Sequence, residues 1–315
     1  MNSFSASDAA FSGFRFIGRQ PMTVLIWASV IFGFELVYGG LLVGFGGGQL
    51  SMIQAMQETN RTDPAMALAM LPKVGFISLV SLMGWLAIAA VMSAAAYRGA
   101  LEPEAHRGRA FLHLGGDEFR MAVLIVLWIA LALGYGFLVL FVCLLVGALG
   151  MALPSLLYYL FLAVVFAAGV CAVIYPLVRL SLSMPMTLRD RHLRLLESWK
   201  PTRGQSWPLL GAYLLSAVLF VVVVFAAWAV VAVIAGIVVA SSGLSLSGLF
   251  SADTSSLAAF FAPTTIIAAL LNALTFAAGV AILTGPVSAA YLVLIEPAAD
   301  GPEPLGAGEP AAVSA

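Results

Sequence analysis

The stretch Arg179–Gly211, RLSLSMPMTLRDRHLRLLESWKPTRGQSWPLLG, decides how this chain is arranged, because it is a basic segment between two long uncharged runs. It holds six of the fourteen lysines and arginines of the chain. An α-helix crosses the roughly 30 Å hydrocarbon layer of a membrane in about 20 residues, and both flanking runs are at least that long. We therefore interpret residues 179–204, called the connector below, as a loop at the cytoplasmic face of a membrane protein.

The composition of the whole chain agrees with a membrane protein. Of its 315 residues, 62% are hydrophobic and 9% are charged, whereas ordinary soluble domains carry about 25% charged residues. A soluble fold this apolar would lack a surface that water can solvate. The net charge is −1, so the chain as a whole shows no preference for nucleic acid as a partner.

Six apolar runs predict six membrane-spanning helices, which makes the expected fold all-α and polytopic. The predicted spans are residues 22–45, 74–97, 121–149, 156–178, 208–240 and 264–295. Together they form one transmembrane domain over residues 21–295. Residues 1–20 are expected to form a cytoplasmic segment lying partly in the membrane interface, and residues 296–315 a disordered, acidic cytoplasmic tail. Residues 47–72, with Pro64 and Pro72 as helix breakers, are predicted to form a short amphipathic hairpin at the outer surface.

The orientation follows from the distribution of lysine and arginine. Twelve of these residues fall on one side of the predicted spans: two in the N-terminal segment, four between the second and third spans, and six in the connector. The other side has Arg61 and Lys73. Positive loops stay in the cytoplasm, so both termini are predicted to be cytoplasmic.

Short similarities within the chain suggest three repeated helical hairpins. SAAAYRGALEP at residues 93–103 and SAAYLVLIEP at residues 288–297 share an Ala-Ala-Tyr followed five residues later by Glu-Pro. Each odd-numbered span is also preceded by a segment that combines an aromatic residue with glycine. This pattern predicts three hairpins, each preceded by an amphipathic segment at the interface.

The connector is the first candidate for a functional surface. Thr187 and Asp190 have the spacing of a capping box, which predicts a helix that continues to Pro201 with Leu188 and Trp199 on its apolar face. A basic helix of this kind lies in the membrane interface and attracts anionic lipid. The predicted lipid- or partner-binding residues are Arg98, Arg179, Arg189, Arg191, Arg194, Trp199 and Arg203. The alternatives are a loop that only sets topology and a docking surface for a protein partner or a second copy of the chain.

The second candidate lies inside the first span. Glu35 is a carboxylate within an apolar run, and an ionisable group at membrane depth is a functional candidate by default. Tyr38 and Asn272 are the polar residues predicted to share its surroundings. An arrangement of these three groups along an internal path would favour a transporter or channel for ions or small solutes.

The loop before the third span carries the remaining polar cluster. His113 and Asp117 are four residues apart, the spacing of two metal ligands on one helix face. Gly115 and Gly116 lie between them and break such a helix, so we instead expect Asp117 to cap the third span and Glu118 to sit in its first turn. No metal site or cofactor is predicted, and the chain has no phosphate-binding loop, zinc-protease or serine-hydrolase motif that would indicate an enzyme.

Two segments resemble a known family. Residues 97–120, YRGALEPEAHRGRAFLHLGGDEFR, and residues 178–215, VRLSLSMPMTLRDRHLRLLESWKPTRGQSWPLLGAYLL, are similar to an uncharacterised family of bacterial six-helix inner-membrane proteins. That family is distantly similar to YciC-like proteins and to the membrane domain of some glycerophosphoryl diester phosphodiesterases. The resemblance implies six helices and the bacterial cytoplasmic membrane. It implies no phosphodiesterase activity, because the chain carries no appended catalytic barrel.

Overall fold

The computed structural model of the chain describes residues 5–59, 64–103, 110–242 and 256–295, and in these ranges every regular element is a helix. Six of the helices are long and apolar enough to cross a membrane, which confirms the all-α, six-span prediction. The long helices are α3 (Pro21–Thr59), α4 (Pro64–Leu101), α5 (Gly116–Leu149), α6 (Ser155–Leu180), α8 (Ser206–Ser242) and α11 (Pro263–Leu294). The short ones are α1 (Ala6–Ala10), α2 (Ser12–Arg19), η2 (Gly150–Ala152), α7 (Ser183–Asp190), η3 (Glu197–Trp199) and α10 (Leu257–Phe260).

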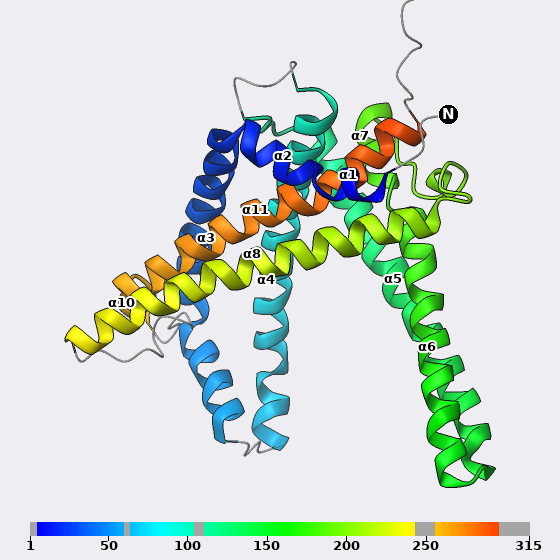
Figure 1. Cartoon of the computed structure of the whole chain (residues 1–315). Helices are drawn as coiled ribbons and strands as arrows, with labels where there is room; N and C mark the ends of the chain where they lie inside the picture. Colours follow the sequence, from blue (N-terminus) through cyan, green and yellow to red (C-terminus); the bar gives the residue numbers. More distant parts are fainter. Residues whose placement is uncertain (1–4, 60–63, 104–109, 243–255, 296–315) are drawn as a thin grey trace, which may run out of the picture.

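The long helices are arranged as three successive hairpins, α3–α4, α5–α6 and α8–α11, and each follows a segment that does not span. Figure 1 shows α3–α4 and α5–α6 as two separate legs, with α8 and α11 crossing obliquely between them. The short helices α1, α2 and α7 lie together at one end of the molecule. The order of elements therefore matches the predicted pattern of three hairpins, each of which follows a segment that does not span.

The core forms where α11 packs against α3, α4 and α8. Trp27 and Ile31 of α3 and Met92 of α4 are fully buried there, against small residues of α11 such as Ala277. Small side chains on α11 let its neighbours approach closely, which is how helices gain packing contacts in a membrane. In contrast, the part of the α5–α6 hairpin farthest from α7 extends beyond this core (Figure 1).

A close contact between glycines fixes the N-terminal segment on the last spanning helix. A Cβ atom added to Gly13 of α2 would collide with the backbone of α11 at Ala281 and Ile282, and one added to Gly285 would collide with the backbone of Gly13. The hydroxyl of Ser216 in α8 also donates a hydrogen bond to the carbonyl of Ala10, at 3.2 Å. Residues 6–19 are therefore part of the helical body and not a free extension.

The first hairpin differs from its prediction. α3 continues to Thr59 and α4 begins at Pro64, so most of residues 47–72 extend the two spanning helices and do not form a separate amphipathic hairpin. Pro64 is the first residue of α4, where the missing N–H has no helical partner to lose. Pro72 lies inside α4 and does not end it. The residues between the two helices and the predicted tail at 296–315 lie outside the described ranges.

The position predicted for the connector helix is also wrong. α7 covers Ser183–Asp190, so it ends within the first turn of the predicted helix, because Arg191 adopts a left-handed conformation with φ of 55°. Thr187 does not cap a following helix; its hydroxyl accepts a hydrogen bond from the backbone N–H of Arg194, at 3.1 Å. That bond folds the chain back on α7, and the next helical turn is η3.

Candidate functional site

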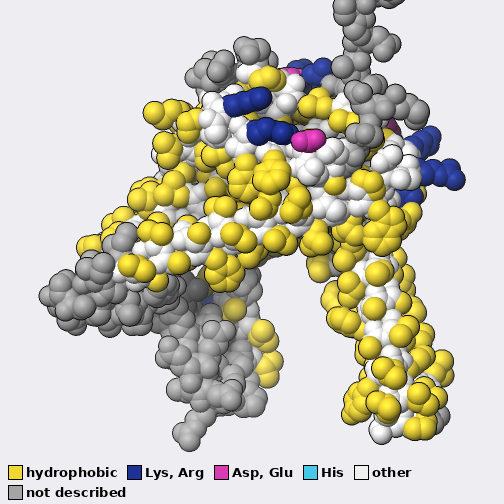
Figure 2. Space-filling model, in the orientation of Figure 1, with side chains coloured by type: hydrophobic (Ala, Val, Ile, Leu, Met, Phe, Trp, Pro, Cys, Tyr) yellow, Lys and Arg dark blue, Asp and Glu magenta, His cyan; other side chains and the backbone are white. Residues whose placement is uncertain are grey.

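Basic side chains are concentrated at the end of the molecule where α1, α2 and α7 lie, which we call the basic end (Figure 2). Of the eleven lysines and arginines in the described ranges, ten belong to the basic end, and Lys73 near the start of α4 is the exception. The end contains the first turns of α3, α5 and α8 and the last turns of α4, α6 and α11. The described lysines and arginines therefore gather at one end of the spanning helices, as the sequence pattern predicts.

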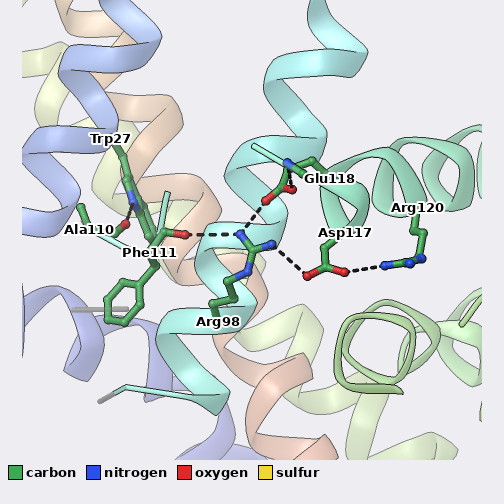
Figure 3. A network of polar contacts seen from close by, with 8 residues as sticks. Trp27, Arg98, Ala110, Phe111, Asp117, Glu118 and Arg120 are labelled. Carbon is green, nitrogen blue, oxygen red and sulfur yellow. Dashed lines mark hydrogen bonds and ion pairs between the residues drawn. The ribbon is translucent and has the colours of Figure 1, made fainter. Parts of the chain in front are cut away.

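Arg98 is the centre of an ion-pair network that joins α4 to α5 (Figure 3). Its guanidinium lies 2.6 Å from the carboxylate of Glu118 and 3.5 Å from that of Asp117, and only about 5% of the residue is exposed. Arg120 pairs with the second oxygen of Asp117 at 2.6 Å. Arg98 lies in the last turn of α4 and the two acids lie in the first turn of α5, so each charge also meets a helix end of favourable polarity.

The loop before α5 is held in an unusual conformation by the same network. Ala110 and Phe111 are buried and both have positive φ, at 50° and 62°. The indole N–H of Trp27 donates to the carbonyl of Ala110 at 2.8 Å, and Arg98 donates to the carbonyl of Phe111 at 3.4 Å. Side chains from α3 and α4 thus offset the strain of two consecutive left-handed residues.

Arg179, at the end of α6, organises a second buried site in the connector. Its guanidinium donates to the hydroxyls of Tyr175 and Thr202 at 2.8 and 3.4 Å and to the carbonyl of Trp199. The guanidinium carbon also lies 4.4 Å from the centre of the Trp199 ring, a cation–π arrangement. Within the described ranges no carboxylate lies within ion-pair distance of Arg179, although the residue is only 6% exposed.

A polar cavity of about 190 Å³ lies between α4, α5 and α7. Arg98, Arg189 and Arg191 line it together with Glu102 and Asp117. Arg189 pairs with Glu102 at 2.7 Å, so acids offset most of the positive charge in this cavity. Three of the arginines predicted to bind a lipid or a partner therefore converge here.

The other predicted connector residues lie outside that cavity. Arg194 pairs with Asp190 at 3.1 Å and with Glu197 at 2.9 Å. Lys200 and Arg203 are exposed, as is Arg191 at the rim of the cavity, and no described carboxylate is paired with any of the three. Exposed apolar side chains accompany these cations: Leu193, Leu196, Trp199 and Trp207.

The intramembrane polar residues are only partly brought together. The side-chain amide of Asn272 in α11 donates to the carboxylate of Glu35 in α3 at 2.6 Å. Tyr38 does not join them: its hydroxyl donates to the carbonyl of Val80 in α4, and its ring stacks on Phe34. The cavities of the basic end and of the α5–α6 hairpin are lined by other described residues.

The partners of the buried arginines were not predicted from the sequence. Glu118 was assigned to the first turn of α5, as it is, but its pairing with Arg98 was not foreseen. The helix is capped at Gly115, whose N–H donates to Glu118 at 2.7 Å, and Asp117 binds arginines instead of serving as the cap. A signal was present: an arginine closing one span and two acids opening the next. Among the described residues no three His, Cys, Asp or Glu side chains are grouped closely enough to hold a metal ion.

Comparisons with protein-family models, with curated proteins and with solved structures gave no match to this chain. The resemblance to the bacterial six-helix family therefore stays a prediction. The chain is an integral membrane protein by its six apolar spanning helices, and its function has to be argued from the geometry of the basic end.

Proposed function

We propose that the chain is a non-enzymatic protein of the bacterial cytoplasmic membrane that binds anionic lipid through the exposed face of its connector, with both termini in the cytoplasm. One observation carries this proposal. The exposed cations Arg191, Lys200 and Arg203 have no described carboxylate partner, and they lie among exposed leucine and tryptophan side chains. Cations beside apolar anchors are the combination that holds a segment in an anionic membrane interface.

The buried arginines have a supporting role in this proposal. Arg98 and Arg179 hold the ends of α4 and α6 against the segments that follow, so they shape the lipid-binding surface without reaching it. Arg179 also adds a positive charge that no described acid offsets. The inner leaflet of the cytoplasmic membrane carries a negative surface potential, which attracts each nearby cation by about 1 kcal/mol.

The test is the composition of the lipid shell that co-purifies with the protein. Membranes containing equal amounts of phosphatidylglycerol and phosphatidylcholine are extracted with a polymer, and the retained lipids are quantified by mass spectrometry. We expect the triple variant Arg191→Gln/Lys200→Gln/Arg203→Gln to lose most of the phosphatidylglycerol enrichment of the wild type. Lys73→Gln, a cation at the opposite end, is the control and should retain it. Equal enrichment in the triple variant and the wild type would refute the proposal.

A second function, proton or ion transport, is favoured by the hydrogen bond between Asn272 and Glu35. This bond joins α3 to α11 within the spans and places a carboxylate beside an amide at membrane depth, as a coupling site requires. If the pair conducts protons, reconstituted protein should dissipate a pH gradient across liposomes and Glu35→Gln should abolish the flux. A flux unchanged by Glu35→Gln would remove this pair from any transport path.

A further inference from the structure

The largest charge imbalance in a cavity of the basic end lies outside the connector. A cavity of about 340 Å³ is enclosed by α2, by the end of α4 and by the last turns of α11. Arg15 and Arg19 of α2 and Gln20, which caps that helix, line one wall, and no described aspartate or glutamate lines the cavity. The smaller cavity between α4, α5 and α7 contains arginines too, but there Glu102 and Asp117 offset them. Both cavities lie at the basic end, but carboxylates line only the one between α4, α5 and α7, as far as the described residues show.

The donors at the α2 wall are available to a ligand. Arg19 makes no ion pair or hydrogen bond with any described residue. Arg15 is held only by an exposed contact with Asp8, 3.9 Å from its carboxylate, and by the carbonyl of the same residue. The side-chain oxygen of Gln20 accepts from Thr23, which leaves its amide group free to donate. Two guanidinium groups and one amide can therefore surround an anion with several oxygen acceptors, and the guanidinium fork fits phosphate oxygens in pairs.

The remaining walls consist mostly of small and apolar residues, together with the hydroxyls of Ser12, Thr284 and Ser288. Along α11 the lining extends from Ala281 to Leu292, about 16 Å of helix. The facing wall is made of Ala96, Gly99 and Ala100 of α4. These positions lie in the last turns of the two spanning helices, so the cavity is bordered by the charged segment on one side and by helix ends that belong to the spans on the other.

We propose that this cavity binds the phosphodiester headgroup of one anionic phospholipid, with the phosphate at Arg15, Arg19 and Gln20 and the glycerol end of an acyl chain against α4 and α11. The volume suits a headgroup, since small-ligand sites begin near 300 Å³. Basic pockets between spanning helices at the cytoplasmic side are places where phospholipid headgroups bind. The wall that carries the cations is rigid, because the glycine contact of Gly13 with α11 fixes α2 in place.

This site is separate from the lipid surface proposed above. The connector predicts a diffuse enrichment of anionic lipid, whereas the cavity predicts one tightly held molecule per chain. The two sets of cations, Arg15 and Arg19 against Arg191 and Arg203, are in different segments. Failure of one proposal therefore leaves the other standing.

Native mass spectrometry of protein released from nanodiscs of mixed phosphatidylglycerol and phosphatidylcholine tests the proposal. We expect one retained phosphatidylglycerol on the wild type and at least a tenfold lower occupancy in Arg15→Gln/Arg19→Gln. The double variant Lys73→Gln/Arg120→Gln loses the same charge outside both the cavity and the connector, and it should keep the bound lipid. Ala289→Leu fills the cavity without changing any charge, and it should also lower the occupancy.

Each alternative outcome overturns the proposal. Equal retention in all variants means that the cavity holds no specific lipid, and equal loss in the two double variants means that only total charge matters. A third arm uses inorganic phosphate with protein in phosphatidylcholine nanodiscs. If phosphate alone raises the melting temperature as much as phosphatidylglycerol does, the cavity takes a soluble anion and the lipid proposal fails.

Discussion

Arg98 and Arg179 occupy equivalent places in the chain and are satisfied in opposite ways. Both lie in the last turn of a spanning helix, α4 and α6, and both are buried. Arg98 pairs with Glu118 and Asp117, whereas Arg179 is surrounded by hydroxyls, a carbonyl and an aromatic ring. An arginine in the last turn of a spanning helix can therefore be neutralised by acids of the next helix, as Arg98 is, or remain a buried positive charge, as Arg179 does. We call the two contacts the neutral joint and the charged joint. The charged joint is the one within the connector.

The largest effect is expected from breaking the neutral joint. Arg98→Ala leaves the buried carboxylate of Glu118 without its cation, and removing one partner of a buried pair destabilises a protein by about 3–5 kcal/mol. The measurement is the free energy of unfolding in detergent, with Arg120→Ala as the control because that arginine is partly exposed and its pair should contribute about 0–1 kcal/mol. Equal free energies of unfolding for Arg98→Ala and Arg120→Ala would contradict this expectation.

Arg179→Ala should have a smaller effect, about 1–3 kcal/mol, because it leaves no stranded carboxylate and removes only hydrogen bonds and ring stacking. The conservative change sharpens the contrast. Lysine keeps a charge but not the planar fork, so Arg98→Lys should retain more of the wild-type stability than Arg179→Lys. The same unfolding measurement on the two lysine variants decides this, and the reverse order would mean that geometry dominates at Arg98.

The aromatic part of the Arg179 joint should be weaker still. Trp199→Leu removes the ring over the guanidinium, a contact of about 1 kcal/mol at a partly exposed site. Trp207→Leu is the matched control, since Trp207 is 80% exposed and makes no ring contact with another described residue. Equal melting temperatures for the two variants would remove the cation–π contact from the description of this joint.

The smallest effect is expected at the hydrogen bond between Glu35 of α3 and Asn272 of α11. Glu35→Gln keeps an oxygen that can accept from Asn272, so the free energy of unfolding should change by less than about 0.5 kcal/mol, the range of neutral substitutions. Asn272→Leu leaves Glu35 without that donor and should destabilise more. A large loss in Glu35→Gln would show that the ionised carboxylate itself stabilises the contact of α3 with α11.

Two features could be predicted from the sequence: the number of spanning helices and the end of the molecule at which the cations gather. Six spans and the gathering of cations at one end follow from hydropathy and from the positions of arginine and lysine. The extent of α3 and α4 was missed because proline was treated as a breaker, although Pro64 occupies the first helical position. The connector helix was misplaced because the capping-box pattern at Thr187 also fits a hydroxyl that closes a loop.

The candidate site was less predictable, because its contacts join residues from different hairpins. Asp117 and Glu118, which pair with Arg98, lie at the start of the helix that follows the one Arg98 ends. A basic residue at the end of one span and acids at the start of the next could have predicted this pairing. Nothing local indicates that Trp27 donates to the carbonyl of Ala110, 83 residues away. The cavity at Arg15 and Arg19 depends on α2 packing on α11, an association of segments at opposite ends of the chain.

That association of α2 with α11 sets an order for biogenesis. A ribosome completes the N-terminal helices first, yet Gly13 finds its binding surface only when Ala281 and Gly285 have been made. At about 5–20 residues per second, this delay is on the order of fifteen seconds to a minute. During that time the first hairpin has to enter the bilayer while α2 has no α11 to bind. We therefore expect α2 to bind α11 late in assembly, after the hairpins have been inserted into the membrane.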